Sequence, residues 1–292
     1  MKVSVVIRTY NEERHIGTLL EALARQETDF ESEIIVVDSG STDRTLEIVA
    51  RFGCRVLEIA KPSFSFGRSL NIGCEAATGC RLVFISGHCI PASGDWLKTL
   101  VAPLGRDSIA YVYGAQFAHE TTKFSEARYF SKCYPAERRI PQEGFFCNNA
   151  NAALLTTAWK EHRFDEALTG LEDMHLAKTL TERGYRIGYV PEAAVCHIHD
   201  ESLPQIRRRF EREAIALQYI MPEVHVTFLD FVRYFASAVV LDSVEAARQQ
   251  VLARTLKDIV LYRLMQFWGS YRGNHYHRKL SRERKEKYFY PK

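Results

Sequence analysis

The first half of the chain alternates short apolar runs with helical patterns. Val3 to Ile7 and Glu33 to Val37 are rich in β-branched residues, and between them apolar residues recur three and four positions apart. We expect further strands at 55–59, 82–85, 109–113 and 185–190, and helices at 43–52, 70–77 and 171–183. Ser69 is a suitable N-cap for the helix that follows it, and Pro191 is expected to end the last strand. This alternation predicts an α/β domain with a mostly parallel central sheet and helices on its faces.

The second part of the chain has a helical pattern almost throughout. From Leu203 to Trp268 the apolar spacing is that of helices, so we expect a helical extension over residues 201–292 behind an α/β domain of residues 1–200. The most apolar stretch, 228–244, is interrupted by three charged residues and falls short of the roughly 18 apolar residues that span a bilayer. No membrane-crossing helix is therefore expected, and the apolar helical surface allows a homodimer.

The composition is that of an ordinary globular protein, but its charge is unevenly distributed. The 292 residues are 46% hydrophobic and 26% charged, which excludes collagen-like, disordered and disulfide-scaffold classes. The net charge is +3, yet residues 270–292 hold eight basic and two acidic residues, which leaves −3 for the rest. Aromatic residues interleave with these basic residues, a composition typical of a segment that lies on anionic lipid. A solvated charged helix is the alternative, and nucleic acid is not an expected partner.

The cysteines indicate the compartment. Seven cysteines occur without a Cys-x-x-Cys spacing, and the first apolar run is too short for a signal peptide. An odd number of unpaired-looking cysteines is typical of reduced thiols. We therefore expect a cytoplasmic protein, with residues 270–292 in contact with the inner face of the plasma membrane.

Polar residues gather where three of the expected strands end. The polar segments are 9–12, 38–43 and 86–89. In an open α/β sheet the ligand crevice lies outside the carboxyl ends of the strands, so three polar ends indicate one binding site. Helix capping by Asn11 or Ser41 is the alternative for the individual residues. No glycine-rich dinucleotide or P-loop motif appears, which argues against a dehydrogenase and a P-loop NTPase.

A run of sequence blocks in one order resembles family 2 glycosyltransferases. The blocks are VSVVIRTYNEERHIGTLLEAL, EIIVVDSGSTDRT, GRSLNIGCEAATG and LVFISGHCIP, followed by YVYGAQF and GLEDMHLAKTLTERGYRIGYVPEAAVCHIH, which look like the bacterial rhamnosyltransferase-like members. The resemblance covers residues 1 to about 200. It implies a GT-A fold, with nucleotide-sugar binding in residues 1–115 and acceptor binding and catalysis in residues 116–200.

The resemblance also implies which residues bind the nucleotide sugar. They are Thr9, Tyr10, Asn11, Glu12, Asp38, Ser41, Arg68, Ser86, Gly87, His88 and Asn151. Asp38 is expected to hydrogen-bond the base or ribose, and Asn151 belongs to a small polar loop that closes over the sugar. For Arg68 the residues give an independent reason, because a guanidinium suits a diphosphate and Gly67 and Gly73 loosen the backbone around it. A surface arginine without a ligand is the alternative.

The expected metal site departs from the family pattern. The family holds Mn²⁺ or Mg²⁺ with an Asp-x-Asp after the fourth strand, where this chain has Ser86-Gly87-His88. The resemblance assigns His197 to the site as a metal or phosphate contact, and His199 shares its face if that stretch is extended. We expect a divalent metal at His88, His197 and His199, bound more weakly than by aspartates or replaced by a softer ion such as Zn²⁺. The alternative is a protonated His88 that contacts the diphosphate without a metal.

Glu172-Asp173 resembles the family's Glu-Asp pair, whose aspartate is the general base of inverting transfer. In a helix, apolar residues three, four and seven positions after Asp173 place its carboxylate on the inward face, while Glu172 points toward His175 and Thr179. The general base accepts the proton of the acceptor hydroxyl as its oxygen attacks the anomeric carbon. The alternative is an aspartate that only complements the helix dipole.

We therefore expect an inverting glycosyltransferase that moves one sugar from a UDP- or dTDP-sugar to a bacterial surface glycan or a lipid-linked acceptor. Two other classes stay open. A sugar-nucleotide-binding module without activity is favoured by the missing Asp-x-Asp. A nucleotidyltransferase should have a glycine-rich, basic loop after the first strand, where this chain has Arg8-Thr9-Tyr10-Asn11.

Overall fold

The computed structural model describes residues 1–276 and divides the chain into two compact units. The first unit consists of Met1–Thr121, Phe130–Leu168 and Glu172–His199, and the second of residues 122–129, 169–171 and those from 200 on. Two short segments inside the expected 1–200 domain thus belong to the second unit. Most of the expected basic tail, residues 277–292, lies outside the described residues.

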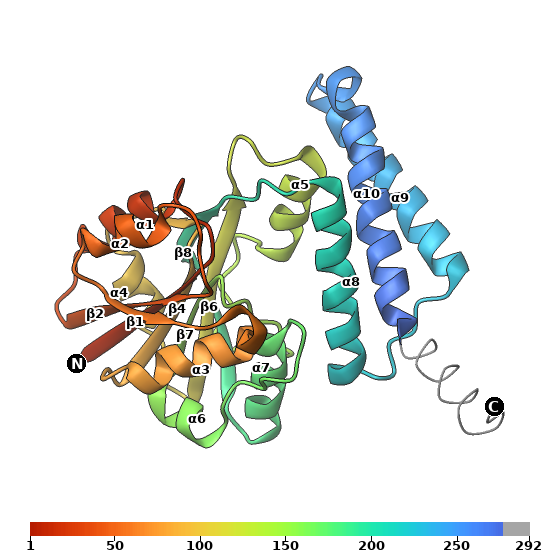
Figure 1. Cartoon of the computed structure of the whole chain (residues 1–292). Coiled ribbons are helices and arrows are strands. Elements are labelled where there is room, and N and C mark those ends of the chain that lie inside the picture. Colours follow the sequence, from red (N-terminus) through yellow and green to blue (C-terminus); the bar gives the residue numbers. More distant parts are fainter. Residues whose placement is uncertain (277–292) are drawn as a thin grey trace, which may run out of the picture. The chain divides into compact units, whose positions relative to one another are not determined.

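The first unit is built on an eight-stranded sheet (Figure 1). Its strands are β1 (Lys2–Thr9), β2 (Glu31–Asp38), β3 (Arg55–Glu58), β4 (Arg81–Ser86), β5 (Cys89–Pro91), β6 (Ile109–Ala118), β7 (Asn151–Leu155) and β8 (Arg186–His197). They lie in the order β3-β2-β1-β4-β7-β6-β8-β5. The first four are parallel, and so are β6 and β8, whereas β7 and β5 are antiparallel to their neighbours. The α/β class is confirmed, and the two antiparallel strands are elements that the sequence pattern did not indicate.

Helices cover both faces of this sheet because the strands alternate the direction of their side chains. Val5 and Ile7 of β1 pack on one face with α1 (Ile16–Ala24), α2 (Thr45–Ala50) and α4 (Trp96–Val101). Val6 packs on the other face with α3 (Phe66–Ala76), α6 (Thr156–Glu161) and α7 (Glu172–Glu182). Helix α5 (Phe124–Cys133) starts in the second unit and ends in the first. Two buried apolar cores therefore hold the sheet between them.

Two expected element ends were wrong. Helix α3 begins four residues early, because Ser65 is its N-cap and accepts a hydrogen bond from the Arg68 N–H, while the Ser69 hydroxyl donates to the Phe66 carbonyl inside the helix. Strand β8 continues through Pro191 to His197. Its pairing with β6 shifts register between Gly114 and Gln116, and this irregularity accommodates a residue that lacks an N–H donor.

The second unit is helical. It contains α8 (Leu203–Ile220), α9 (Phe228–Arg248) and α10 (Leu252–Asn274). Helices α8 and α10 pack around Ile206, Phe210 and Tyr262. They approach closely at Gly273, where a Cβ atom would lie only 2.2 Å from the Glu211 carbonyl oxygen. Within residues 1–276, none of the helices combines the length and the apolar character needed to cross a bilayer.

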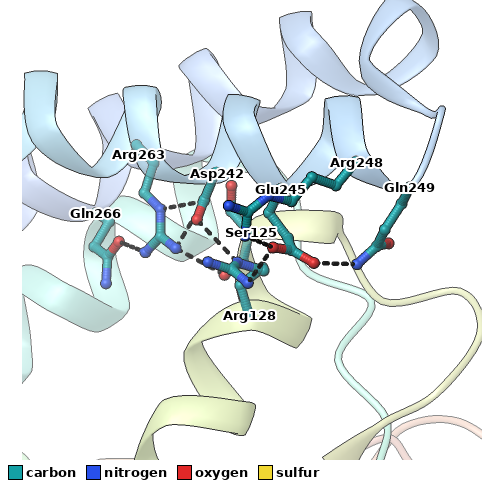
Figure 2. Close-up of polar contacts among 8 residues, drawn as sticks. All are labelled: Ser125, Arg128, Asp242, Glu245, Arg248, Gln249, Arg263 and Gln266. Atoms are coloured by element: carbon teal, nitrogen blue, oxygen red, sulfur yellow. Dashed lines mark hydrogen bonds and ion pairs between the residues drawn. The ribbon is translucent and has the colours of Figure 1, made fainter.

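A buried ion-pair network joins α9 to α10 and to the start of α5 (Figure 2). The Asp242 side chain is fully buried, and one of its oxygens accepts a 2.8 Å hydrogen bond from Nε of Arg263 and forms a 2.8 Å ion-pair contact with Nη2. Arg263 also donates to Gln266 and to the Ser125 carbonyl oxygen. Arg128 lies 3.5 Å from the other Asp242 oxygen. The buried charges of Asp242 and Arg263 are therefore paired with each other and hydrogen-bonded to neighbouring polar groups. Charges are tolerated in a protein interior under this condition.

This network predicts a large effect on stability. Asp242→Ala leaves Arg263 buried without its counter-charge, so we expect the free energy of unfolding of the second unit to fall by about 3–5 kcal/mol. The exposed Asp258 on α10 offers a matched control, and Asp258→Ala should change stability by less than about 0.5 kcal/mol. Urea denaturation measures both, and equal midpoints for the two variants would contradict the role given to Asp242.

Candidate functional site

The carboxyl ends of β1, β2 and β4 lie side by side in the first unit (Figure 1). In the parallel register Thr9 is paired with Asp38, and Arg8 is paired with Ser86. The polar segments that follow these strands are therefore neighbours, as expected from the sequence. Apolar residues bury the strands themselves, so only their ends present polar groups.

Asp38 holds the loop that follows β2. One of its carboxylate oxygens accepts 2.8 Å hydrogen bonds from the N–H groups of Gly40 and Ser41, and the other accepts a 2.5 Å bond from the Ser41 hydroxyl. Gly40 has a φ of +84°, a conformation that glycine adopts without strain. Asp38 is fully buried. The Asp38 carboxylate thus shapes the loop, and a contact with base or ribose stays a prediction.

Asn11 ties the loops after β1 and β2 together. Its N–H donates to the Ser41 hydroxyl at 2.8 Å, and its side-chain oxygen accepts a 2.8 Å bond from the Thr42 N–H. Asn11 has a φ of 55°, which asparagine tolerates better than most residues. The helix-capping alternative is wrong, because the N-caps of α1 and α2 are His15 and Arg44.

An aromatic and a basic side chain meet beside the loop after β1. Tyr10 is 48% exposed, and the Lys61 ammonium lies 4.9 Å from the centre of its ring. Arg68 is exposed in the first turn of α3, and no hydrogen bond or ion pair of its guanidinium occurs within residues 1–276. Gly67 and Gly73 were expected to loosen the backbone around Arg68, but both lie within helix α3. Gly67 instead permits close packing, since a Cβ atom there would lie 2.2 Å from the Asp165 carbonyl oxygen.

Two of the predicted donor-binding residues are covered. Thr9 is only 4% exposed, and its hydroxyl oxygen has no hydrogen-bond partner in the described chain. Asn151 is fully buried: its amide donates to the carbonyl oxygens of Ala115 and Ala193, and its oxygen accepts from the Trp96 indole. Asn151 therefore connects neighbouring strands in the core. The expectation that it contacts the sugar is corrected, because its side chain is covered and fully hydrogen-bonded.

Three histidines meet beside the end of β4. His88 directly precedes β5, which pairs antiparallel with the end of β8, and the Ile198 N–H donates to the His88 carbonyl oxygen. This pairing brings His88, His197 and His199 together, with ligand atoms within 4.8 Å of one another. The Nε2 atoms of His88 and His197 are 3.1 Å apart. Cys89 is packed in the core, where burial raises the pKa of its thiol well above the usual range.

The outer nitrogens of two of these rings are held by oxygen acceptors. His88 Nδ1 lies 2.6 Å from a Glu12 carboxylate oxygen. His197 Nδ1 lies 2.6 Å from the Gln116 side-chain oxygen, and the Gln116 amide donates to Asn148, which orients it. The oxygen acceptors occupy both Nδ1 atoms, which leaves the two Nε2 atoms, facing each other, as the ring atoms that would bind a metal. Such an arrangement fits a bound cation, since two histidine ligands of a tetrahedral ion lie about 3.3 Å apart.

Glu172 and Asp173 begin α7 and are both buried. Glu172 does not point toward His175 and Thr179 as expected. Its carboxylate instead accepts a 3.1 Å hydrogen bond from the Arg8 guanidinium at the end of β1. The Arg8 guanidinium in turn lies 5.1 Å from the centre of the Phe66 ring. The ion pair places the start of α7 at the same edge of the sheet as the loops after β1 and β4.

The environment of Asp173 suits proton transfer near neutral pH. Its two carboxylate oxygens accept 2.8 Å hydrogen bonds from the N–H groups of Asn149 and Met174. Burial and, next, the negative charge of Glu172 raise the pKa of Asp173 to about 7, against the opposing effect of these hydrogen bonds and of Arg8. A carboxylate with a pKa close to the working pH is an effective general base.

A continuous set of contacts links Asp173 to the three histidines. Asn149 donates its N–H to Asp173, and the neighbouring Asn148 accepts from the Gln116 amide, which in turn holds His197. The base candidate and the metal candidate therefore belong to one site, although they are far apart in the sequence. Sequence reasoning missed Arg8 and Gln116 as parts of it. Arg8 and Gln116 did carry a signal, since each is a polar residue within an apolar strand.

Comparison with known proteins gives the family of the chain. The sequence model described as glycosyl transferase family 2 matches residues 4–162, which is more than half of the chain. The O-antigen chain rhamnosyltransferase RfbN of Salmonella typhimurium is 27% identical over 212 residues, covering 68% of this chain and 67% of that protein. The O-antigen chain rhamnosyltransferase WbaN of Salmonella anatum is 26% identical over 199 residues, covering 64% and 62%. The chain thus spans about two thirds of these relatives.

Solved structures share the fold. The mannosyltransferase PcManGT from Pyrobaculum calidifontis, in complex with GDP-Man and Mn²⁺, superposes with a TM-score of 0.65 at 17% identity, covering 93% of this chain and 86% of that one. Glucosyl-3-phosphoglycerate synthase from Mycobacterium tuberculosis, in complex with Mn²⁺, UDP and glucosyl-3-phosphoglycerate, has a TM-score of 0.56 at 22% identity and covers 75% and 79%. The fold is therefore GT-A, as the sequence blocks implied. Together with the family match over residues 4–162, it shows that this chain is a glycosyltransferase and belongs to glycosyl transferase family 2.

Proposed function

We propose that this glycosyltransferase moves a single sugar, with inversion, from a UDP- or dTDP-sugar to a bacterial surface glycan or a lipid-linked acceptor. The observation that carries the proposal is Asp173, a buried carboxylate with a pKa of about 7 beside the polar strand ends. The acceptor class rests on the O-antigen rhamnosyltransferases among the relatives. The family assignment also argues against the nucleotidyltransferase alternative.

In the proposed reaction Asp173 takes the proton of the acceptor hydroxyl. The hydroxyl oxygen forms a bond to the anomeric carbon while the bond from that carbon to the diphosphate oxygen breaks. The nucleoside diphosphate leaves with the bonding electrons, and a single displacement of this kind inverts the anomeric configuration. Asn149 and Met174 hold the carboxylate in place through their N–H groups. Arg8 positions Glu172, and the negative charge of Glu172 helps to raise the pKa of Asp173 to about 7.

The loops after β1 and β2 would bind the nucleotide. Tyr10 offers an exposed ring for stacking, and the loop held by Asp38 carries Ser41 beside it in the sequence segment expected to bind the nucleotide. Lys61 lies against the Tyr10 ring, and Arg68 is exposed in the first turn of α3; both cations suit the charge of a diphosphate. Glu12 is placed against His88 and would orient the histidine rather than contact the donor itself.

A divalent metal would be held by His88, His197 and His199. When bound, the ion neutralises charge on the diphosphate and so makes it a better leaving group. Nitrogen ligands favour Zn²⁺ and comparable transition ions over Mg²⁺, although Mn²⁺ stands in the structural neighbours. The sequence also left an alternative in which a protonated His88 binds the diphosphate directly and no metal is needed. An experiment on metal content distinguishes this alternative from the metal site.

We further propose that the enzyme works in the cytoplasm. All seven cysteines are free, from Cys54 to Cys196, which suits a reducing compartment. Nucleotide sugars and the inner membrane surface are both available there to an enzyme that extends lipid-linked glycans.

Asp173→Asn tests the transferase and its base together. Release of nucleoside diphosphate from a panel of nucleotide sugars should fall by about 10²–10⁴-fold, because the amide cannot take the acceptor proton, while donor binding persists. Asp29→Asn, at a side chain that is 73% exposed, is the matched control and should be fully active. Full activity of Asp173→Asn would overturn the base assignment. If the wild-type protein binds a donor but turns over none of the panel, it is a binding module.

Glu172→Gln should move the pH profile. Transfer requires ionised Asp173, so activity of the wild-type enzyme should rise with pH through about 7. Removing the Glu172 charge lowers the pKa of Asp173, and the freed Arg8 charge acts in the same direction. The acidic limb of kcat/KM should therefore shift to lower pH. Glu182→Gln, exposed at the other end of α7, should leave the profile in place, and an unmoved limb in Glu172→Gln would refute the coupling.

Metal content tests the histidine site. We expect His88→Ala and His197→Ala to lose the bound transition metal after dialysis against Zn²⁺ or Mn²⁺, whereas His225→Ala, at an exposed position in the second unit, retains it. Elemental analysis per mole of protein measures this without reference to activity. If EDTA leaves diphosphate release unchanged and the wild-type protein binds no ion, the direct contact through His88 is the correct interpretation.

A further inference from the structure

The first unit contains a pocket whose lining includes none of the residues assigned above to the donor, the base or the metal. Its volume is about 680 Å³, which falls within the roughly 300–1,000 Å³ typical of small-molecule sites. One wall is the segment 137–143, and Phe146, Cys133 at the end of α5 and Tyr113 of β6 complete the lining. Most of the pocket is therefore made by the connection between α5 and β7.

The wall of this pocket is held by the sheet. The backbone of Arg139 pairs antiparallel with β8, with N–H to carbonyl distances of 3.2 and 2.7 Å. The Gln142 N–H donates to the Ile187 carbonyl oxygen at 2.8 Å. The Gln142 side chain accepts a 2.7 Å bond from the Tyr113 hydroxyl and donates a 2.6 Å bond to the Phe146 carbonyl oxygen. The pocket is therefore preformed, so a ligand does not have to order its wall.

The charged side chains of the wall balance one another. Two carboxylates and two guanidinium groups are exposed there, at Glu137, Arg138, Arg139 and Glu143. Arg139 donates to Glu137 at 3.1 Å, and Arg138 donates to Glu192 of β8 at 3.3 Å. With Glu192 included, the group has one more carboxylate than guanidinium. It offers many hydrogen-bond donors and acceptors without a positive excess, which suits a hydroxyl-rich, uncharged ligand better than a phosphate.

Aromatic rings form the inner side of the pocket. The ring centres of Phe146 and Tyr113 are 5.4 Å apart, and Tyr134 packs against both at 6.2 and 6.5 Å. Tyr113 is only 5% exposed, whereas Phe146 is half-buried, so Phe146 is the ring that a ligand can reach. The carbon–hydrogen face of a sugar ring packs on aromatic carbon, and its hydroxyl groups need polar partners around the edge. An aromatic side bordered by carboxylates and guanidinium groups meets both requirements.

The pocket lies close to Asp173. Tyr111 and Tyr113 are two positions apart on β6 and share one face of the sheet, about 7 Å apart along the strand. The Tyr111 hydroxyl donates to the Asn149 side-chain oxygen, and the Asn149 N–H donates to Asp173. Burial and, next, the negative charge of Asp173 raise the pKa of the Cys147 thiol well above its usual range, and Cys147 directly follows the aromatic side of the pocket. The pocket and the base candidate are therefore neighbours.

We propose that this pocket binds a neutral sugar residue of the acceptor and so contributes to the choice of glycan. The proposal rests on the proposed function and names the acceptor chemistry at its site. A sugar held beside Asp173 presents a hydroxyl group to that carboxylate, which takes the proton while the hydroxyl oxygen attacks the anomeric carbon of the donor and the nucleoside diphosphate leaves. The donor itself is a poor occupant, because its diphosphate is repelled by a pocket with an excess of carboxylates.

Glycoside binding in the absence of donor tests the pocket. The probes are the methyl glycosides of rhamnose, galactose, mannose, glucose and N-acetylglucosamine, and saturation-transfer NMR measures their dissociation constants. At least one should bind the wild-type protein. Glu143→Ala with Arg138→Ala should weaken that binding at least about tenfold, because hydrogen bonds to two hydroxyl groups are lost. Phe146→Leu should weaken it about threefold or more, since the aromatic face is lost. Glu21→Ala with Arg25→Ala, an exposed pair on α1, is the matched control and should bind as the wild type does.

Other outcomes overturn the proposal. Unchanged glycoside binding by the pocket variants excludes this pocket, and a wild-type protein that binds none of the five glycosides excludes a neutral sugar as its ligand. Inorganic phosphate that binds the wild type but not the Glu143→Ala, Arg138→Ala variant identifies an anion as the occupant instead. Sugar transfer to the same glycosides is measured in parallel. Transfer with an unmoved acceptor KM in the pocket variants refutes the pocket alone, whereas glycoside binding in the pocket without any transfer refutes the proposed function alone.

Discussion

The register of β1 with β2 and β4 is the constraint on which the site depends. It sets Thr9 beside Asp38 and Arg8 beside Ser86, so the three polar loops that follow have to share one edge of the sheet. Buried apolar residues on both faces make this register costly to change, because a shift of one residue would turn every core side chain to the wrong face. The loops can then carry polar groups that would be unstable elsewhere in the core.

Charge is balanced tightly within the site. Two neighbouring carboxylates, Glu172 and Asp173, are buried together, an arrangement that raises the free energy of the ionised pair. Arg8 compensates one of them, and backbone N–H groups compensate the other in part. The histidines are also held by neighbouring polar groups. Oxygen acceptors at Glu12 and Gln116 bind the Nδ1 atoms of His88 and His197 and so direct the two Nε2 atoms toward one point. Perturbed groups of this kind gather where chemistry is performed.

The helical unit uses burial of charge for a different purpose. Arg263 and Asp242 are satisfied by each other and by neighbouring polar groups, so they fix the rotation of α9 without leaving a free charge. The consequence is an outer face that is apolar although it lies in contact with solvent. Exposed apolar side chains on a helix whose buried face includes a charged residue are unusual, and such surfaces often mark sites of interaction.

The sequence by itself determined the fold class, the family blocks and the polar ends of the parallel strands, because these depend on short-range patterns of apolar and polar residues. It also predicted roles for Asp173 and His197 through the resemblance, and for His88 because this residue stands where the family has an Asp-x-Asp. Only the tertiary structure decided that β8 continues past Pro191, since a shifted register with β6 tolerates the proline. It likewise decided that Asn151 is a core residue and that Arg8 meets Glu172, because contacts across 42 and 164 residues depend on which strands become neighbours.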